Sequence, residues 1–175
     1  MQRKEELAGQ VCPVCQTKNL TLNEAEDDIP YFGKVYIFSM TCTNCKFHKS
    51  DLESAEHREP TRYSIEISGD EDCKIRIVKS SQATVKIPYI TTIEPGVAAN
   101  GYITNVEGLF SRIKQQLESV RDVAEEKEDQ KKAKNMLKKI SRTLYGSEKL
   151  KIIIEDPSGN SAIISDRAVV EKMKA

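Results

Sequence analysis

The stretches Cys12-Pro13-Val14-Cys15 and Cys42-Thr43-Asn44-Cys45 decide how the first part of this chain folds. Each Cys-x-x-Cys turn brings two thiolates close together, and two such turns supply the four sulfurs that tetrahedral Zn²⁺ binds at about 2.3 Å. Four protein sulfurs leave no open position on the metal for water or substrate. The spacing therefore predicts one structural zinc ion held by Cys12, Cys15, Cys42 and Cys45.

Two other interpretations of the cysteines are weaker. A disulfide framework needs an oxidising compartment, and the opening residues Met1 to Glu6 carry no apolar signal segment. A thioredoxin-like redox pair does not explain two widely separated Cys-x-x-Cys turns. The fifth cysteine, Cys73, lies in a strand-like run, and we expect it to be a small core residue.

The 26 residues between the cysteine pairs are enough for a β-hairpin. Thr21 to Glu24 and Lys34 to Thr41 have strand-like content. The acidic residues Glu24 to Asp28 separate them and predict a turn.

Composition and charge limit the class of protein. The chain has 175 residues, with 27 lysines and arginines against 27 aspartates and glutamates. Net neutrality gives no reason to expect nucleic acid as a partner. A basic run without acids, Lys131 to Arg142, is typical of a solvated helix face. No apolar run approaches the roughly 18 residues of a membrane span, so we expect a soluble, cytoplasmic protein with no membrane partner.

Alternating apolar residues predict a β-domain after the zinc module. Tyr63, Ile65 and Ile67 share one face of a strand. The pattern repeats in three further short runs, Lys74 to Lys79, Ala83 to Ile87 and Tyr89 to Ile93. Several short strands in succession indicate a sandwich or barrel.

The periodicity becomes helical at Val106 and continues to about residue 146. The charged stretch Ala124 to Lys132 suits a turn between two antiparallel helices, but one long helix with an exposed middle is equally compatible with the pattern. Strand content returns at Leu150 to Glu155. The turn residues Asp156 to Asn160 are expected to reverse the chain into a strand at Ser161 to Ile164.

Beyond the cysteine pairs, the chain carries short motifs at Ile29 to Val35, Val78 to Ser81, Val85 to Pro88, Gly101 to Gly108 and Asp156 to Ser161. In this order and spacing they resemble the ZPR-type zinc-finger proteins, in a single-domain form that looks archaeal. The resemblance implies a zinc ribbon over residues 1–58. It also implies a double-stranded β-helix, which is a jelly-roll-like domain, over residues 59–175, with a helical hairpin inserted at about 106–146. The fold class is thus mainly β, and two helices are favoured over one.

The resemblance also implies a partner. Family members with two such units bind translation elongation factor 1-alpha, a GTPase, and assist its folding. Growth-factor receptor binding, described in animals, has no meaning for a microbial chain. Gln16 and Lys46 stand where the family usually has glycine, after the second cysteine of each turn; this affects the shape of the loop more than zinc binding.

Tyr31, Phe32 and Glu107 are candidate partner-binding residues. Aromatic side chains at a loop tip often dominate interfaces, although Tyr31 and Phe32 could equally pack the ribbon onto the β-domain. Asn105 is expected to cap the following helix, since its side-chain oxygen can accept from a free backbone N–H.

The sequence leaves three classes of function to compare. The first is a protein-binding factor that recognises elongation factor 1-alpha and aids its folding or release. The second is a nucleic-acid-binding ribbon, supported by Lys131 to Arg142. The third, an enzyme with a cupin-like metal cage, is poorly supported because His48 and His57 form no ligand pair and no nucleophile with an adjacent base appears. We expect no catalytic activity, and the sequence does not indicate an oligomeric state.

Overall fold

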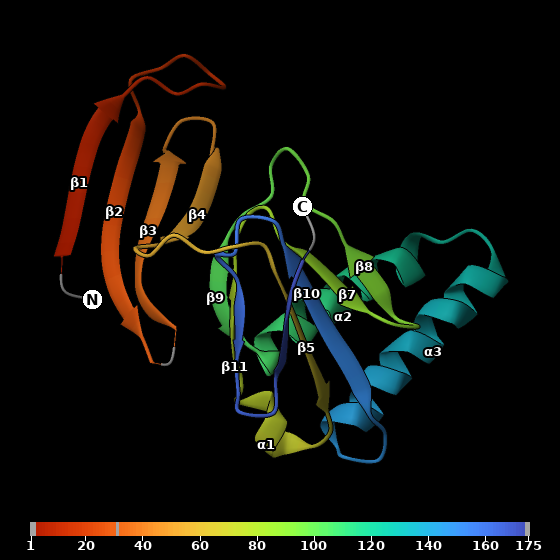
Figure 1. Ribbon diagram of the computed structural model, residues 1–175. Coiled ribbons are helices and arrows are strands. Elements are labelled where there is room, and N and C mark those ends of the chain that lie inside the picture. The colour runs from red at the N-terminus through yellow and green to blue at the C-terminus, as the bar shows by residue number, and fades with distance from the viewer. Residues whose placement is uncertain (1–2, 31, 174–175) are drawn as a thin grey trace.

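The computed structural model describes residues 3–30 and 32–173. The N-terminal part is a four-stranded antiparallel sheet in the order β1-β2-β3-β4. Its strands are Arg3–Gln10 (β1), Leu20–Ile29 (β2), Gly33–Cys42 (β3) and His48–Ser54 (β4). The sheet stands to one side of the rest of the molecule, coloured red to orange in Figure 1.

The acidic stretch Glu24 to Asp28 lies inside β2, so the prediction of a turn there was wrong. The strand continues to Ile29, which pairs with Gly33. Ile29 is 1% exposed, and burial of this side chain at the end of the hairpin favours the longer strand. The acids are compatible with it because this part of the sheet is open to solvent, where Lys34 Nζ lies 2.5 Å from a Glu26 carboxylate oxygen.

Two further sheets form the β-domain. One has the order β12-β5-β10-β7-β8 and the other the order β11-β6-β9. Their strands are Thr61–Ile67 (β5), Arg76–Lys79 (β6), Thr84–Ile87 (β7), Thr91–Ile93 (β8), Tyr102–Asn105 (β9), Leu150–Asp156 (β10), Ala162–Ile164 (β11) and Val169–Lys172 (β12). Sequence neighbours are often in different sheets, which is typical of a jelly roll.

The turn after β10 does not form the simple reversal that its sequence suggested. β10 pairs with β5 and β7, whereas β11 pairs with β6 in the other sheet. The residues Asp156 to Ser161 therefore carry the chain from one sheet to the other.

Two helices form the insertion, as the family resemblance favoured. They are Val106–Val123 (α2) and Lys127–Leu144 (α3), which make a hairpin beside the β-domain (Figure 1). Asn105 caps α2, because its side-chain oxygen accepts a hydrogen bond from the Gly108 N–H at 2.8 Å. A short helix, Asp70–Cys73 (α1), replaces the expected strand at Cys73, and this cysteine is buried as predicted.

The main core joins both sheets of the β-domain to the helical hairpin. Its buried residues include Ile65, Ile67, Ile77, Val85, Ile87, Leu109, Phe110, Ile113, Ile140, Ile152, Ile154 and Ile163. A second cluster joins the ribbon to the β-domain through Ile29, Phe32, Val35, Leu52, Val78 and Ala162. No helix within residues 3–30 and 32–173 is both long and apolar enough to cross a membrane.

Candidate zinc site and interaction surfaces

Two tight turns at one end of the ribbon hold the four cysteines. Cys12 and Cys15 lie between β1 and β2, and Cys42 ends β3 shortly before Cys45. In the second turn the Lys46 N–H donates to the Cys42 carbonyl at 3.1 Å, and the first turn is closed in the same way. Gln16 and Lys46 have φ angles of 59° and 62°, the left-handed region in which glycine is usual.

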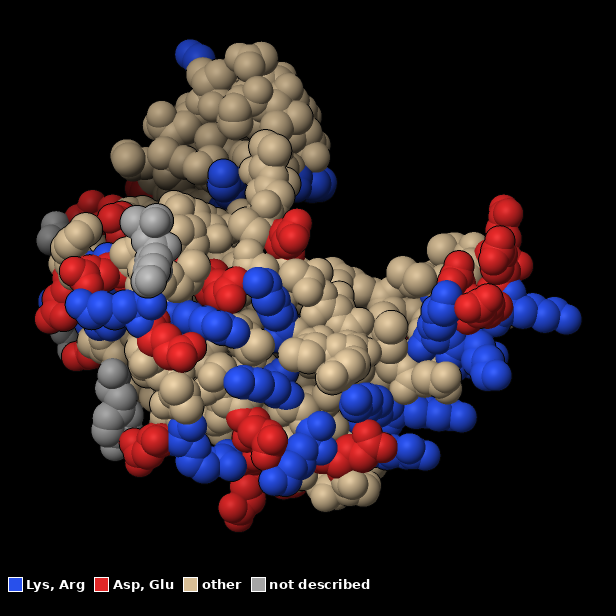
Figure 2. All heavy atoms as spheres, turned by 45° about the vertical axis from the view of Figure 1, so that its right-hand side comes forward, with Lys and Arg blue, Asp and Glu red and all other residues tan. Residues whose placement is uncertain are grey.

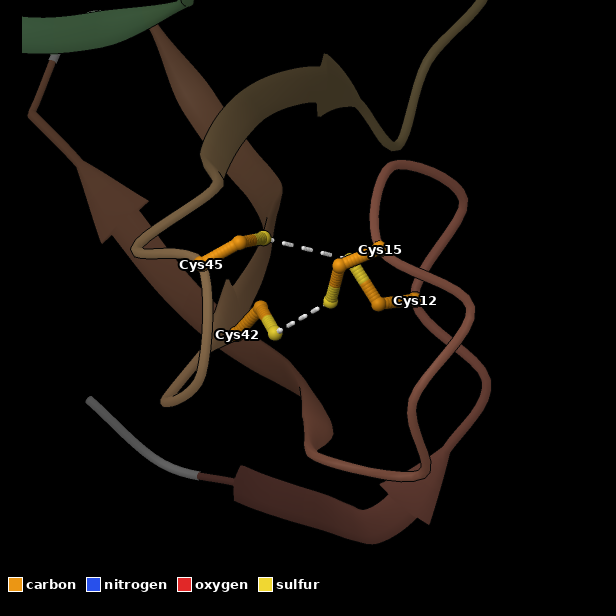
Figure 3. Close-up of side chains that lie close together, drawn as sticks. All are labelled: Cys12, Cys15, Cys42 and Cys45. Atoms are coloured by element: carbon orange, nitrogen blue, oxygen red, sulfur yellow. Dashed lines mark hydrogen bonds between the residues drawn. The ribbon is translucent and has the colours of Figure 1, made fainter.

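The geometry of the sulfurs fits zinc. All four Sγ atoms lie within 4.8 Å of one another, and Figure 3 shows them converging from the two turns. The Cys12–Cys45 and Cys15–Cys42 sulfurs are 3.7 and 3.6 Å apart. A regular tetrahedron with Zn–S bonds of about 2.3 Å has sulfur–sulfur edges of about 3.8 Å. The four thiols therefore form a site suited to a single structural zinc ion, without a disulfide between any of them.

The surroundings of the sulfurs are partly apolar and favour the thiolate at Cys15. Cys12 and Cys42 are buried with Leu20, and Phe47 packs against them. The Thr17 hydroxyl, 3.2 Å from the Cys15 sulfur, and the Asn44 side chain lower the pKa of the Cys15 thiol to about 5. A zinc ligand must be a thiolate, so the surroundings of Cys15 favour the metal-binding form of this residue, whereas burial and the neighbouring sulfurs raise the pKa of the Cys45 thiol to about 12.

The structure places the candidate partner-binding residues in different settings. Phe32 is 4% exposed, and the Arg58 guanidinium lies over its ring at 4.2 Å. It packs the ribbon onto the β-domain, which was one of its two expected roles. Glu107 is exposed in the first turn of α2. Tyr31 lies outside the described residues.

Polar contacts that the sequence did not predict attach the ribbon to the β-domain along β4. Asp51 accepts hydrogen bonds from the backbone N–H of Ser81 at 2.9 Å and from its hydroxyl. The Gly101 N–H donates to the Ser50 carbonyl at 2.9 Å. A Cβ at Gly101 would lie 2.4 Å from an Asp51 carboxylate oxygen, so glycine is needed for this close approach.

A buried cluster around Asp156 continues this junction. Asp156 is 1% exposed, and its carboxylate accepts hydrogen bonds from the hydroxyls of Ser80, Ser158 and Ser161 at 2.8, 2.6 and 2.5 Å. Lys79 is also buried, and burial lowers the pKa of its ammonium group despite the attraction of Asp156 and Asp51. The Asp156–Asn160 segment has the expected turn character, because the Ser158 N–H donates to Asp156. The segment also binds Ser80, 76 positions earlier in the chain, and this contact cannot be predicted from the local sequence.

A stripe of lysines follows the exposed face of α3. Lys131, Lys134 and Lys138 are exposed and form no ion pair within residues 3–30 and 32–173. Lys139 lies over the ring of Tyr89, with 5.0 Å between its Nζ and the ring centroid. Figure 2 shows basic side chains gathered on the side of the molecule that carries α3. The basic run is thus a solvated helix face.

A four-cysteine ribbon docked to a jelly-roll domain with a helical hairpin defines a class of zinc-ribbon protein. A family model described as the ZPR1 zinc-finger domain matches residues 6–60, and one described as the ZPR1 jelly-roll domain matches residues 71–174. The chain belongs to the ZPR1 family.

Similar proteins occur in archaea and in eukaryotes. A ZPR1-like protein of Methanocaldococcus jannaschii is 38% identical over 157 residues, which cover 89% of this chain and 79% of that protein. A ZPR1-like protein of Pyrococcus horikoshii is 34% identical over 168 residues, which cover 93% and 75%. The zinc finger chaperone of Schizosaccharomyces pombe is 31% identical over 163 residues, but these cover 87% of this chain and only 34% of the yeast protein.

Proposed function

We propose that this chain is a protein-binding factor that recognises translation elongation factor 1-alpha and assists its folding or release. The observation that carries the proposal is the 31% identity to a relative named as a zinc finger chaperone. The choice of elongation factor 1-alpha follows from the family resemblance. Four thiolates would complete the coordination of zinc, so the metal would stabilise the fold of the ribbon and would take no part in a reaction.

The arrangement of the domains supports a binding role. The ribbon is fixed to the β-domain by an apolar cluster and by hydrogen bonds along β4. A partner would therefore meet a preorganised surface, which lowers the entropic cost of binding. Glu107 remains a candidate contact because it is exposed at the start of α2.

Calorimetric titration tests the proposal. The zinc-loaded chain is titrated into purified archaeal elongation factor 1-alpha with GTP, with GDP and without nucleotide. Saturable binding that differs among these states supports a GTPase-directed chaperone or release factor. Absence of binding in all three states, with both proteins folded, contradicts the proposal.

Nucleic acid is the second candidate partner, and the exposed lysine stripe of α3 favours it. Each neutralised phosphate releases condensed counterions, so binding to RNA or DNA would weaken steeply as salt increases. Replacing Lys131, Lys134 and Lys138 by Gln should then reduce the salt slope of binding by about 2 to 3. A duplex or single strand that binds the triple variant as tightly as the wild type excludes this stripe as its site.

A further inference from the structure

One face of the ribbon sheet, the outward face, takes no part in the apolar cluster that joins the ribbon to the β-domain, although its edge at β4 reaches the β-domain through Asp51. In an antiparallel ladder, residues directly opposite one another have side chains on the same face. Ile37 is opposite Leu52, and both pack in the cluster that joins the ribbon to the β-domain. The alternate residues, Phe38 and Met40, must therefore point to the other face.

An apolar groove crosses this outward face. Leu7 is opposite Leu22, which is opposite Met40, so the three side chains form a row across β1, β2 and β3. Together with Phe38 they line a hollow of about 400 Å³ that extends to β4. Leu7 is 62% and Phe38 is 38% exposed, although both are large apolar side chains. Exposed apolar surface of this kind commonly marks an interaction site.

Acidic side chains line one side of the groove. Glu5 is opposite Glu24, which is opposite Phe38, so both carboxylates lie beside the apolar row. The same two residues also line an adjoining polar hollow of about 300 Å³ with Glu26 and Tyr36. Lys49 is the basic residue that faces the apolar groove among its described lining residues. A segment that fills the groove would therefore place its polar end among carboxylates.

We propose that this groove binds a segment of a protein partner in which large apolar side chains are flanked by lysine or arginine. The apolar row accepts the apolar side chains, and Glu5 and Glu24 attract the basic ones. This assignment deepens the proposed protein-binding function and rests on it. It locates the contact on the outward face of the ribbon, where Leu22 and Met40 pack against the cluster of Cys12, Leu20 and Cys42, and away from the α3 stripe.

The width of the sheet limits the length of the segment. Neighbouring strands are about 4.8 Å apart, so the groove spans about 14 Å from β1 to β4. About ten residues of helix, at 1.5 Å per residue, cover this distance. A short amphipathic helix laid in an apolar groove is a common mode of peptide recognition.

A defined peptide tests the groove without any elongation factor. The blocked peptide Lys-Leu-Lys-Lys-Leu-Leu-Lys-Lys-Leu-Lys is titrated into the zinc-loaded, ¹⁵N-labelled full chain, and amide shifts are followed by NMR. The amides of Leu7, Leu22, Phe38 and Met40 should shift along a saturable curve. Peptides with Glu for every Lys, or with Ser for every Leu, should bind at least tenfold more weakly.

Variants of the chain complete this test. Phe38→Ser should weaken peptide binding at least tenfold, and Glu24→Lys at least threefold in low salt. Glu118→Lys makes the same charge change at an exposed position of α2, and it should leave the affinity for the peptide unchanged. Zinc content and thermal unfolding identify any variant that does not fold, and Leu7→Ser on the edge strand then replaces Phe38→Ser.

The proposal is overturned if the ribbon amides do not shift, or if the peptide binds the folded Phe38→Ser and wild-type chains equally. It is also overturned if the same amides shift with protein concentration alone, since a second copy of the chain then occupies the face. Titration of Phe38→Ser into elongation factor 1-alpha is a separate experiment. If the wild-type chain binds the peptide but not elongation factor 1-alpha, the proposed partner is wrong and the groove proposal stands. If it binds the factor but not the peptide, the groove proposal is wrong and the proposed partner stands.

Discussion

Asp156 is a single residue on which the junction between the two sheets depends. It is buried, and three serine hydroxyls donate to its carboxylate. Asp156→Ala would leave these hydroxyls without their acceptor in a buried site. We expect the free energy of unfolding to fall by about 2 to 4 kcal/mol, measured by urea denaturation of the zinc-loaded protein.

Asp166 supplies the matched control for this substitution. It is an exposed aspartate in the turn after β11. Asp166→Ala should change the free energy of unfolding by less than about 0.5 kcal/mol. Equal losses in the two variants would show that the Asp156 hydrogen bonds contribute nothing of their own.

Asn105 is a second residue whose side chain stabilises the fold, because it caps α2. Its oxygen accepts from the Gly108 N–H at the start of α2. Asn105→Ala removes this acceptor and should lower the free energy of unfolding by about 1 kcal/mol in a denaturation experiment. Asn105→Asp retains an acceptor and should be close to wild type; if both variants lose the same amount, the side chain does not stabilise α2 by capping.

At the scale of elements, the helical hairpin is part of the core of the β-domain. Ile140 of α3 is 0% exposed and packs in the main cluster with residues of β5, β7 and β10. Ile140→Ala should therefore lower the free energy of unfolding by about 3 kcal/mol, because it leaves a cavity. Lys138→Ala, on the exposed face of the same helix, should change it by less than about 0.5 kcal/mol. A small loss at Ile140 would mean that the hairpin unfolds independently of the sheets.

The elements that the sequence predicts well are those with an unambiguous period. The stripe that begins at Val106 belongs to a helix because its apolar residues have one face to bury. The acidic residues of β2 were misread because they break the apolar alternation, and only pairing with β3 identifies them as a strand. β1 was not predicted at all, since residues 4–10 are all exposed and carry no burial pattern.

The zinc ligands were predictable because their spacing alone describes the site, whereas the contacts along β4 were not. The bond between Asp51 and Ser81 joins residues 30 positions apart, and nothing local to either residue indicates the other. The same applies to the crossing after Asp156, where the turn residues are recognisable but the sheet that receives the next strand is not. The local sequence indicates whether a segment is a strand or a turn, whereas tertiary packing decides which strand it pairs with.

At the scale of the whole molecule, two parts differ in what stabilises them. The β-domain and its hairpin bury a large continuous apolar core that contains no zinc ligand. The zinc end of the ribbon has only a small cluster, in which Cys12, Leu20 and Cys42 are the buried members. A small core of this kind needs the metal, and the binding free energy of a structural zinc is also folding free energy.

Cys42→Ser, or removal of zinc by a chelator, should accordingly unfold the ribbon and leave the β-domain folded. NMR should show collapse of the dispersed amide signals of β2 and β3, while those of β10 persist. Zinc content, measured by atomic emission, should fall from one ion per chain to nearly none. Because Ile29 and Phe32 of the ribbon cover Val78 and Ala162, the β-domain should also melt several degrees lower.

The conservative control for this experiment is Cys73→Ser. Cys73 is buried in α1, far along the chain from the four ligands, and burial raises the pKa of its thiol. Its replacement should retain one zinc per chain and a folded ribbon. Unchanged zinc content in Cys42→Ser would contradict the ligand assignment. Simultaneous loss of both sets of amide signals would instead show that the junction along β4 makes the ribbon and the β-domain a single cooperative unit.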